Sequence, residues 1–276
     1  GMARRGHRIF IAGRRRGEFL RAAHGGVPVV RVSAPFAGEW DLYTAWKLAR
    51  LVRREQIDII HAHTSHTHGV ACLVRCLAGK GVVVVSRRVD FPPKDNGFNR
   101  IKYDCPHGYI AISGRIAEVL REAGIPSDKV HLVRSSIDPE RFDVGAIERR
   151  ELGVPEGVPL LGNVAALVGH KDHATLLDAM PLVLRDLPDL HLVIAGDGPL
   201  RTVLTEQIAR LELTEHVHLL GYRKDVPRIL RALDGFVLSS KEEGLGTSVL
   251  DAMACGVPVV ATAGGGIPET VRHGET

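Results

Sequence analysis

The chain has 276 residues, which is enough for one large domain or two of medium size. It is 45% hydrophobic and 25% charged, as expected for a globular protein, and its net charge of +4 is only mildly basic. Aromatic residues make up 5%, which argues against a base-stacking surface, so no nucleic-acid partner is expected. The four cysteines include no C-x-x-C pair, which disfavours a zinc ribbon or a disulfide framework and favours a reduced, cytoplasmic setting.

The first half alternates short apolar runs with amphipathic segments. Strands are expected at residues 8–12, 27–32, 57–63, 82–86, 109–112 and 130–133, and helices at 42–54, 69–77 and 113–124. In the helix at 42–54, Trp46, Leu48 and Leu51 are expected to share one side. Residues 91–99 contain two prolines and a glycine and are expected to form a loop.

The second half repeats this alternation after a charged, glycine-containing stretch at 139–157. Strands are expected at 160–165, 190–195, 217–220, 236–238 and 259–262, with helices starting near Asp172, Pro199, Asp225, Ser248 and Pro268. The pattern predicts an α/β fold with parallel sheets. The charged stretch predicts a boundary between one domain at 1–152 and a second at 153–276.

The stretch after the strand at 236–238 carries two carboxylates and two glycines. Glu243 and Asp251 could accept hydrogen bonds from sugar or ribose hydroxyls, and Gly244 and Gly246 would let a ligand approach the backbone. Helix-start amides favour a phosphate, so recognition of a sugar attached to a nucleoside diphosphate is predicted. The alternative is purely structural: Ser248 and Asp251 would form a capping box, and the glycines would make a tight turn.

Other candidate residues carry weaker signals. Lys171 follows a strand and could neutralise a diphosphate, or it could be a solvated surface lysine. His61 and His63 share a strand face, but no acidic residue or cysteine lies at a familiar zinc spacing, so no metal is expected and a substrate contact by His63 is favoured. Cys72 and Cys76 lie one helical turn apart and are expected to pack in a core.

Basic side chains are frequent in the first half, where they include Arg14, Arg15, Arg16, Arg21, Lys47, Arg50, Arg53 and Arg54. A solvated face is the ordinary explanation. An anionic membrane surface or a phosphorylated acceptor is the functional alternative.

Several stretches together resemble a known family. In order, the second half contains Lys171, Gly196–Pro199, Gly221–Val226, Glu243–Gly246 with Asp251, and Gly264–Glu269. Taken together they resemble the nucleotide-sugar-binding domain of the retaining, two-domain glycosyltransferases of family 4. The first half looks like the acceptor domain of that family through Ile59–His63 and Ile137–Phe142. The resemblance implies the GT-B architecture, two Rossmann-like doubly wound parallel-sheet domains facing a cleft.

The resemblance also implies roles for individual residues. Glu243 would contact the donor sugar, Asp251 the ribose and Lys171 the departing diphosphate. Further donor-binding positions are Gly198, Tyr222, Arg223, Gly244, Leu245, Gly246 and Thr247, with Tyr222 and Arg223 near the base. His63 and Arg88 would lie on the acceptor side. The family needs no cofactor and no bound metal.

This sequence departs from the family pattern at three positions. Asp251 stands where glutamate is usual, Ala166 where an arginine often accompanies the lysine, and Arg88 where a histidine is often found. The chain also begins near the end of the family's first helix and stops before its last strand and helix, so it is expected to be a fragment of a longer protein.

The expected activity is transfer of a sugar from a nucleoside-diphosphate sugar to a lipopolysaccharide or other cell-envelope glycan. The acceptor is a glycan or a lipid-linked molecule, and the basic first half would contact the inner membrane surface peripherally. Two alternatives stay open: a nucleotide-sugar epimerase or phosphorylase on the same scaffold, and a nucleotide-binding but inactive fragment.

Overall fold

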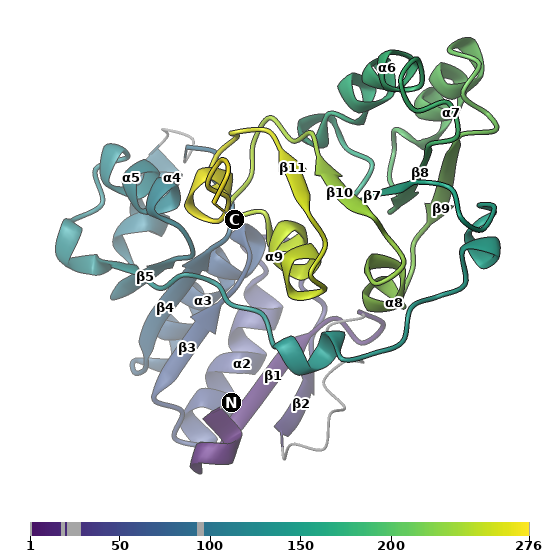
Figure 1. The fold of residues 1–276 in the computed structure, drawn as a ribbon. Helices are drawn as coiled ribbons and strands as arrows, with labels where there is room; N and C mark the ends of the chain where they lie inside the picture. The colour runs from purple at the N-terminus through teal and green to yellow at the C-terminus, as the bar shows by residue number, and fades with distance from the viewer. Residues whose placement is uncertain (1, 18–19, 21–28, 93–96, 276) are drawn as a thin grey trace. The chain divides into compact units, whose positions relative to one another are not determined.

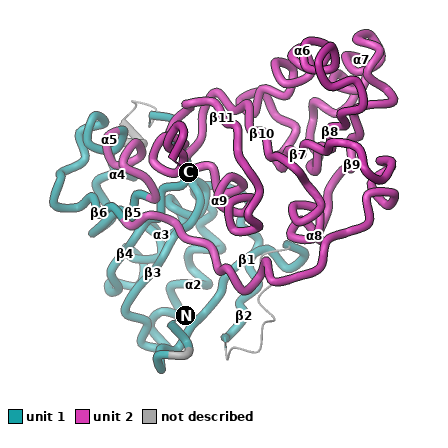
Figure 2. Tube along the Cα trace, in the orientation of Figure 1, with its two compact units in different colours: residues 1–111, 119–132 teal, residues 112–118, 133–276 magenta. Residues whose placement is uncertain are grey.

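The computed structural model describes residues 2–17, 20, 29–92 and 97–275 (Figure 1). These residues form two compact units (Figure 2). The first comprises Gly1–Ala111 and Val119–Leu132, and the second Ile112–Glu118 and Val133–Thr276. Residues 133–152 belong with the second unit because Phe142, Ile147 and Leu152 are buried in its core.

Six parallel strands occur in the first unit. β1 (Ile9–Gly13) pairs with β2 (Val29–Ser33), and a separate sheet has the order β3 (Ile59–Ala62), β4 (Val82–Arg87), β5 (Gly108–Ala111) and β6 (Val130–Leu132). The helical segments are η1 (Met2–Arg5), α2 (Leu42–Arg54), α3 (Ser65–Ala78), α4 (Gly97–Asp104), α5 (Gly114–Glu122) and η2 (Ser127–Lys129). Residues 27 and 28 of the strand predicted at 27–32, and Arg21 of the basic set, lie outside the described residues.

Helix α2 has the predicted bounds, but Trp46 does not share a side with Leu48, which packs against an apolar cluster. Trp46 is 49% exposed, and the helix instead buries Ala45, Ala49 and Val52. These small side chains pack with Val70 and Val74 of α3 in one apolar cluster. Small residues let two helix backbones approach closely, which a tryptophan in that interface would prevent.

Helix α4 covers the end of the segment predicted to be a loop, so that prediction is wrong for residues 97–99. The helix is anchored by Lys102, whose side chain is only 2% exposed. Its Nζ lies 2.9 Å from Oε1 of Glu39 and 3.1 Å from Oγ of Ser65. A buried ammonium needs hydrogen-bonding partners. Lys102 finds them in Glu39 and Ser65, which are remote from it in the sequence.

The second unit contains one five-stranded parallel sheet. Its order is β11 (Val259–Ala261), β10 (Gly235–Leu238), β7 (Leu160–Val164), β8 (His191–Ala195) and β9 (Val217–Gly221). The helices are α6 (His173–Val183), α7 (Arg201–Arg210), α8 (Val226–Leu230) and α9 (Thr247–Ala254), with short 3₁₀ segments η3 (Pro139–Phe142), η4 (Arg149–Leu152), η5 (Gly169–Lys171) and η6 (Ile267–Glu269). The helix predicted to start near Pro268 is therefore only the three-residue segment η6 within the described residues.

Strand β8 is buried on both faces. Leu192 and Ile194 belong to the core cluster that includes residues of α6 and α7, whereas Val193 and Ala195 belong to the cluster that includes residues of α8 and α9. Successive strand residues point to opposite faces, so helices cover both sides of the sheet. The predicted α/β, doubly wound parallel-sheet fold is confirmed.

Candidate functional site

In the sheet of the second unit, the order in which the chain adds strands reverses beside the central strand, β7. From β7 the chain moves through β8 to β9 on one side, and then returns to place β10 on the other side of β7. The loops that follow β7 and β10 therefore leave neighbouring strands at the point where the strand order reverses, and an open α/β sheet binds its ligands at such a switch point. Lys171 lies in the loop after β7, and Glu243 lies in the loop after β10.

These two loops bring Lys171 and Glu243 together. The Lys171 ammonium forms an ion pair with Oε1 of Glu243, and the two side chains are 18% and 11% exposed. Ser240, which is fully buried, donates its hydroxyl to the same carboxylate oxygen at 3.0 Å. Ser239 donates to the carbonyl oxygen of Lys171 at 3.0 Å. The sequence analysis assigned no role to either serine. Their position, as a polar pair directly after an apolar strand, was a signal that could have indicated a site.

Backbone contacts join the same loops to the loop after β11. The N–H of Lys241 donates to the carbonyl of His170 at 2.9 Å, and the N–H of Gly266 donates to the carbonyl of Glu243 at 2.7 Å. A Cβ on Gly266 would lie 2.4 Å from the carbonyl oxygen of Gly244. The glycine at position 266 is therefore required by close packing of the two loops.

Helix α9 begins without a side-chain cap. Its N-cap is Gly246, at φ +72°, and among the described residues no side chain bonds to the first-turn amides as a cap. The capping box predicted as the structural alternative, from Ser248 to Asp251, is therefore wrong. Leu245 is buried and Thr247 is exposed, and the backbone N–H groups of the first turn have no cap from the side chain of the N-cap residue.

Asp251 does not join the Lys171–Glu243 pair. Its carboxylate is half-buried on α9 and has no hydrogen-bond partner among the described side chains. Burial raises the pKa of Asp251, and the positive charge of Arg141 opposes that shift. A partly desolvated carboxylate without a partner is suited to accept hydrogen bonds from a hydroxyl-bearing ligand.

The remaining predicted donor residues are held by local contacts. A Cβ on Gly198 would lie 2.5 Å from the carbonyl oxygen of Leu167, so this glycine lets the loop after β8 pack on the loop after β7. Tyr222 is 61% exposed. Arg223 donates from Nε and Nη2 to the two carboxylate oxygens of Asp225, at 2.8 and 2.6 Å, and this pairing raises the pKa of Arg223.

A buried polar network includes His173, two positions after Lys171 in the chain. His173 is 1% exposed, and its Nε2 is 3.2 Å from Oδ1 of Asn163, whose amide donates to the carbonyl of Val237 at 2.8 Å. Because Oδ1 can only accept, Nε2 carries the proton, and Nδ1 is buried without a partner in the described structure. Burial lowers the pKa of His173 to about 4, so the ring is neutral at pH 7. Sequence reasoning did not find this network, which ties β7 to β10.

In the first unit, the predicted acceptor-side residues lie at the ends of β3 and β4. The rings of His61 and His63 are 4.1 Å apart, and Nε2 of His61 is 2.8 Å from Oγ of Ser86. Partial desolvation and the charge of Arg88 lower the pKa of His63. His63 and Arg88 directly follow the neighbouring, paired strands β3 and β4.

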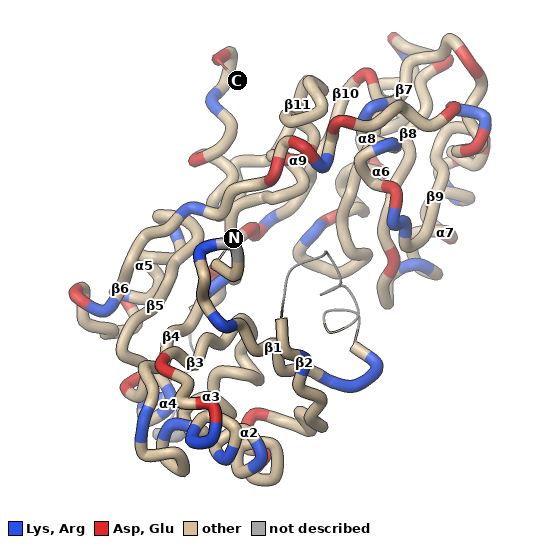
Figure 3. Tube along the Cα trace, turned by 90° about the horizontal axis from the view of Figure 1, so that it is seen from below, with Lys and Arg blue, Asp and Glu red and all other residues tan. Residues whose placement is uncertain are grey.

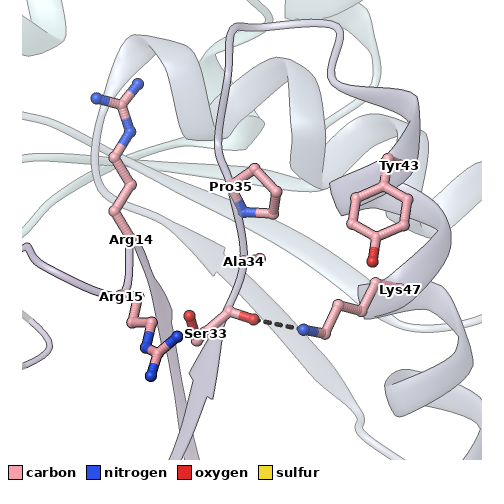
Figure 4. A pocket seen from close by; sticks show the side chains of 7 residues that line it. All are labelled: Arg14, Arg15, Ser33, Ala34, Pro35, Tyr43 and Lys47. Atoms are coloured by element: carbon pink, nitrogen blue, oxygen red, sulfur yellow. Dashed lines mark hydrogen bonds between the residues drawn. The ribbon is translucent and has the colours of Figure 1, made fainter.

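Lysine and arginine positions are also frequent along α2 and near β2 of the first unit (Figure 3). A hollow of about 350 Å³ is lined by Arg14, Arg15, Tyr43 and Lys47, whose ammonium donates to the carbonyl of Ser33 at 2.6 Å (Figure 4). A second hollow of about 930 Å³ is lined by residues of β2 and α2 that include Trp46, Arg50, Arg53 and Arg54.

Neither a metal-binding cluster nor a membrane-spanning helix occurs within the described ranges. There, no three side chains of His, Cys, Asp or Glu gather in a way that could hold a metal ion. Likewise, none of the helices in residues 2–17, 20, 29–92 and 97–275 combines the length and apolarity needed to cross a membrane.

Comparison with known families decides the relationship. Residues 1–141 match the family model Glycosyltransferase Family 4, and residues 146–276 match the model Glycosyl transferases group 1. The chain belongs to glycosyltransferase family 4. The predicted family resemblance is therefore confirmed over both halves of the chain.

Individual members of the family are similar at moderate identity. An N-acetyl-alpha-D-glucosaminyl L-malate synthase of Bacillus anthracis is 27% identical, over 86% of this chain and 65% of its own length. A UDP-Gal:alpha-D-GlcNAc-diphosphoundecaprenol alpha-1,3-galactosyltransferase of Escherichia coli is 26% identical, over 80% of this chain and 62% of its own. The chain thus spans less than two thirds of these glycosyltransferase family 4 relatives.

A crystal structure of Anabaena Alr3699/HepE in complex with UDP-glucose has the same fold. It superimposes with a TM-score of 0.78 and 23% identity, over 96% of this chain and 75% of that one. The GT-B fold predicted for this member of glycosyltransferase family 4 is confirmed by this likeness.

Proposed function

We propose that this chain is the substrate-binding and catalytic part of a retaining glycosyltransferase that transfers a sugar from a nucleoside-diphosphate sugar to a cell-envelope glycan or lipid-linked acceptor. The observation that carries the proposal is the meeting of Lys171 and Glu243 at the switch point of the second sheet. The galactosyltransferase activity of the E. coli relative and the UDP-glucose bound to Alr3699/HepE support the choice of donor class.

Each charged group has a distinct task in this proposal. The Lys171 ammonium stabilises the negative charge that develops on the diphosphate as it leaves. The Glu243 carboxylate accepts hydrogen bonds from hydroxyls of the donor sugar, and the N–H groups from Gly244 to Thr247 lie beside it at the start of α9. Asp251, the partly buried carboxylate without a partner, accepts hydrogen bonds from the ribose.

The ion pair itself suggests how the donor enters. Lys171 and Glu243 satisfy each other when no ligand is between them, so each charge has a partner before binding. A donor replaces this pair with a phosphate on Lys171 and a sugar hydroxyl on Glu243. Ser240 holds the carboxylate in place during this exchange because its own bond to Oε1 can persist.

We place the acceptor on the first unit, with His63 and Arg88 as its contacts. The cationic surface of β2 and α2 supports a peripheral position of the enzyme at an anionic, cytoplasm-facing membrane surface. Lys47, Arg50, Arg53 and Arg54 contribute positive charge there, and Trp46 supplies an exposed aromatic ring.

The test compares Lys171→Met and Glu243→Gln with their neighbours Lys241→Met and Glu242→Gln in the intact protein. Lys241 and Glu242 are exposed side chains of the same loop, which makes them matched controls. Release of nucleoside diphosphate from UDP-glucose, UDP-galactose and GDP-mannose is measured with membrane extract as acceptor. Each site variant is expected to lose about 10²–10³-fold in rate, as for removal of one preorganised charge-stabilising group.

The outcomes separate the proposal from its alternatives. The proposal fails if both site variants stay within about threefold of the wild-type rate, or if the controls lose as much as they do. An epimerised sugar formed without acceptor would identify an epimerase. Tight nucleotide binding without turnover would identify an inactive binding protein.

A further inference from the structure

Glu269, the last residue of η6, has no task in the proposed function but bonds to a remote helix. Its carboxylate accepts hydrogen bonds from the N–H of Gly114 at 2.9 Å, on Oε2, and from the N–H of Arg115 at 3.0 Å, on Oε1. Gly114 and Arg115 are the first two residues of α5 and belong with Glu269 to the second unit, which includes Ile112–Glu118. Glu269 therefore joins the loop after β11 to the start of α5.

The first turn of α5 receives its hydrogen-bond acceptors from two places. Ser113, the fully buried residue before the helix, accepts from the N–H of Ile116 at 3.2 Å on its hydroxyl oxygen. Glu269 accepts from the two amides that precede Ile116. The first amides of a helix have no acceptor within the helix, and a carboxylate is favoured at that end. Ser113 supplies a local cap, whereas Glu269 supplies a second cap from a distant loop.

The surroundings of Glu269 hold its carboxylate in this place. The side chain is only 21% exposed, and its Oε2 lies 3.3 Å from Nε of Arg134. A Cβ on Gly114 would lie 3.2 Å from Oε1, so the glycine leaves room for the carboxylate. Burial raises the pKa of Glu269, but the hydrogen bonds from Gly114 and Arg115 and the charge of Arg134 outweigh burial and lower the pKa overall. Glu269 is therefore charged at pH 7.

The segment that ends in Glu269 also contacts the loop that carries Glu243. The N–H of Glu269 donates to the carbonyl of Gly266 at 3.1 Å, and the N–H of Gly266 donates to the carbonyl of Glu243 at 2.7 Å. Ile267 is 2% exposed, and a Cβ on Gly246, the N-cap of α9, would lie 3.2 Å from its Cγ1. Residues 264–269 thus contact α5 at one end and the Glu243 loop at the other.

We propose that Glu269 is a positioning residue for the donor site: by binding the first turn of α5, it fixes residues 264–267 and, through them, the loop that carries Glu243. Glu269 acts through Gly266 and needs no contact of its own with the donor. Its effect on the rate rests on the proposed function, in which Glu243 contacts the donor sugar. A carboxylate that served only as a helix cap would stabilise α5 and leave the Glu243 loop unchanged.

The first experiment measures amide hydrogen exchange in the intact protein without ligand, by mass spectrometry of peptides. Glu269→Ala should speed exchange both in residues 113–119 and in residues 262–268, where the Gly266 amide lies. Ser113→Ala is the matched control, because it removes the other cap of the same helix; it should speed exchange in residues 113–119 only. Glu275→Gln, which changes an exposed carboxylate of the same segment, should alter neither peptide.

The second experiment measures nucleoside-diphosphate release with the donors named above, at a temperature where every variant is folded. Glu269→Ala should lower kcat/KM by about 10²-fold, as expected for a shift of about 1 Å in a group that contacts the substrate. Glu269→Gln should lose less, because its amide oxygen can still accept one of the two hydrogen bonds. Ser113→Ala and Glu275→Gln should stay within about threefold of the wild-type rate.

The proposal is overturned if Glu269→Ala speeds exchange in residues 113–119 alone, or if it keeps a rate within about threefold of the wild type while Glu243→Gln does not. It is also overturned if Ser113→Ala lowers the rate as much as Glu269→Ala, because loss of either cap would then be enough. A wild-type rate in Glu243→Gln would instead count against the proposed function. The exchange comparison uses no donor, so it decides separately whether Glu269 anchors residues 264–267.

Discussion

Gly266→Ala should damage the donor loop while leaving the rest of the second unit folded. A Cβ at this position would lie 2.4 Å from the carbonyl oxygen of Gly244, about 1 Å inside ordinary contact, which begins near 3.4 Å. The atoms it meets are backbone, so the loop that carries Glu243 must move by roughly that distance. Gly266 has φ −87°, which alanine adopts without strain, so the effect is purely steric.

The expected loss follows from this displacement. A misplacement of about 1 Å in a catalytic group can cost about 10²-fold in rate, and overpacking costs about 1–3 kcal/mol in stability. Nucleoside-diphosphate release gives the first quantity and urea unfolding the second. Gly169→Ala is the matched control, since Gly169 lies in η5 beside Lys171 and a Cβ there would meet nothing within 4 Å.

The reasoning is refuted if Gly266→Ala releases nucleoside diphosphate at the wild-type rate. It is equally refuted if Gly169→Ala loses as much activity, because the effect would then not come from the steric contact with Gly244. A rate loss that persists at temperatures where both variants are fully folded separates loop displacement from general destabilisation.

Three further predictions concern stability, each measured by urea unfolding. Stability should fall as the pH drops from 6.5 towards 4, because unfolded histidine takes up a proton that buried, neutral His173 does not. A pKa of about 4 against 6.5 makes the share of His173 roughly 3 kcal/mol. His173→Gln should remove this share, whereas His61 and His68, whose pKa burial also lowers to about 4, keep theirs. Glu39→Gln should cost about 3 kcal/mol by leaving the Lys102 ammonium buried without a carboxylate, and adding Lys102→Met should recover much of it. Trp46→Ala should cost less than about 0.5 kcal/mol, whereas Ala49→Leu should cost about 1–3 kcal/mol; equal costs would contradict the observed packing.

Much of the strand pattern could be predicted from the sequence because the strands are short apolar runs bounded by glycine, proline or charge. β8 is an example, since this strand is buried on both faces and its residues 192–195 are all apolar. The order of the strands within each sheet could not be predicted from these apolar runs. The position of β10 beside β7, which brings Glu243 to Lys171, is set by pairing between strands remote in sequence, and no pattern within either strand records it.

The parts that could not be predicted depend on contacts between remote residues. Helix α4 has a polar sequence, and its anchor, Lys102, finds its carboxylate 63 positions earlier, at Glu39. Likewise, the Asn163–His173 pair exists because β10 presents the carbonyl of Val237 to β7. The exposure of Trp46 follows from the close approach of α3 to α2, which no pattern within α2 records.

The two-sided burial of β8 restricts where this chain can change length. Deleting or inserting one residue in the strand would exchange Leu192 and Ile194 with Val193 and Ala195, so that both helical layers would receive side chains of the wrong volume at once. Insertions and deletions are therefore tolerated only beyond the ends of β8. The loop after β8 packs on the loop that carries Lys171, so a change of length there would reach the site without disturbing either hydrophobic layer.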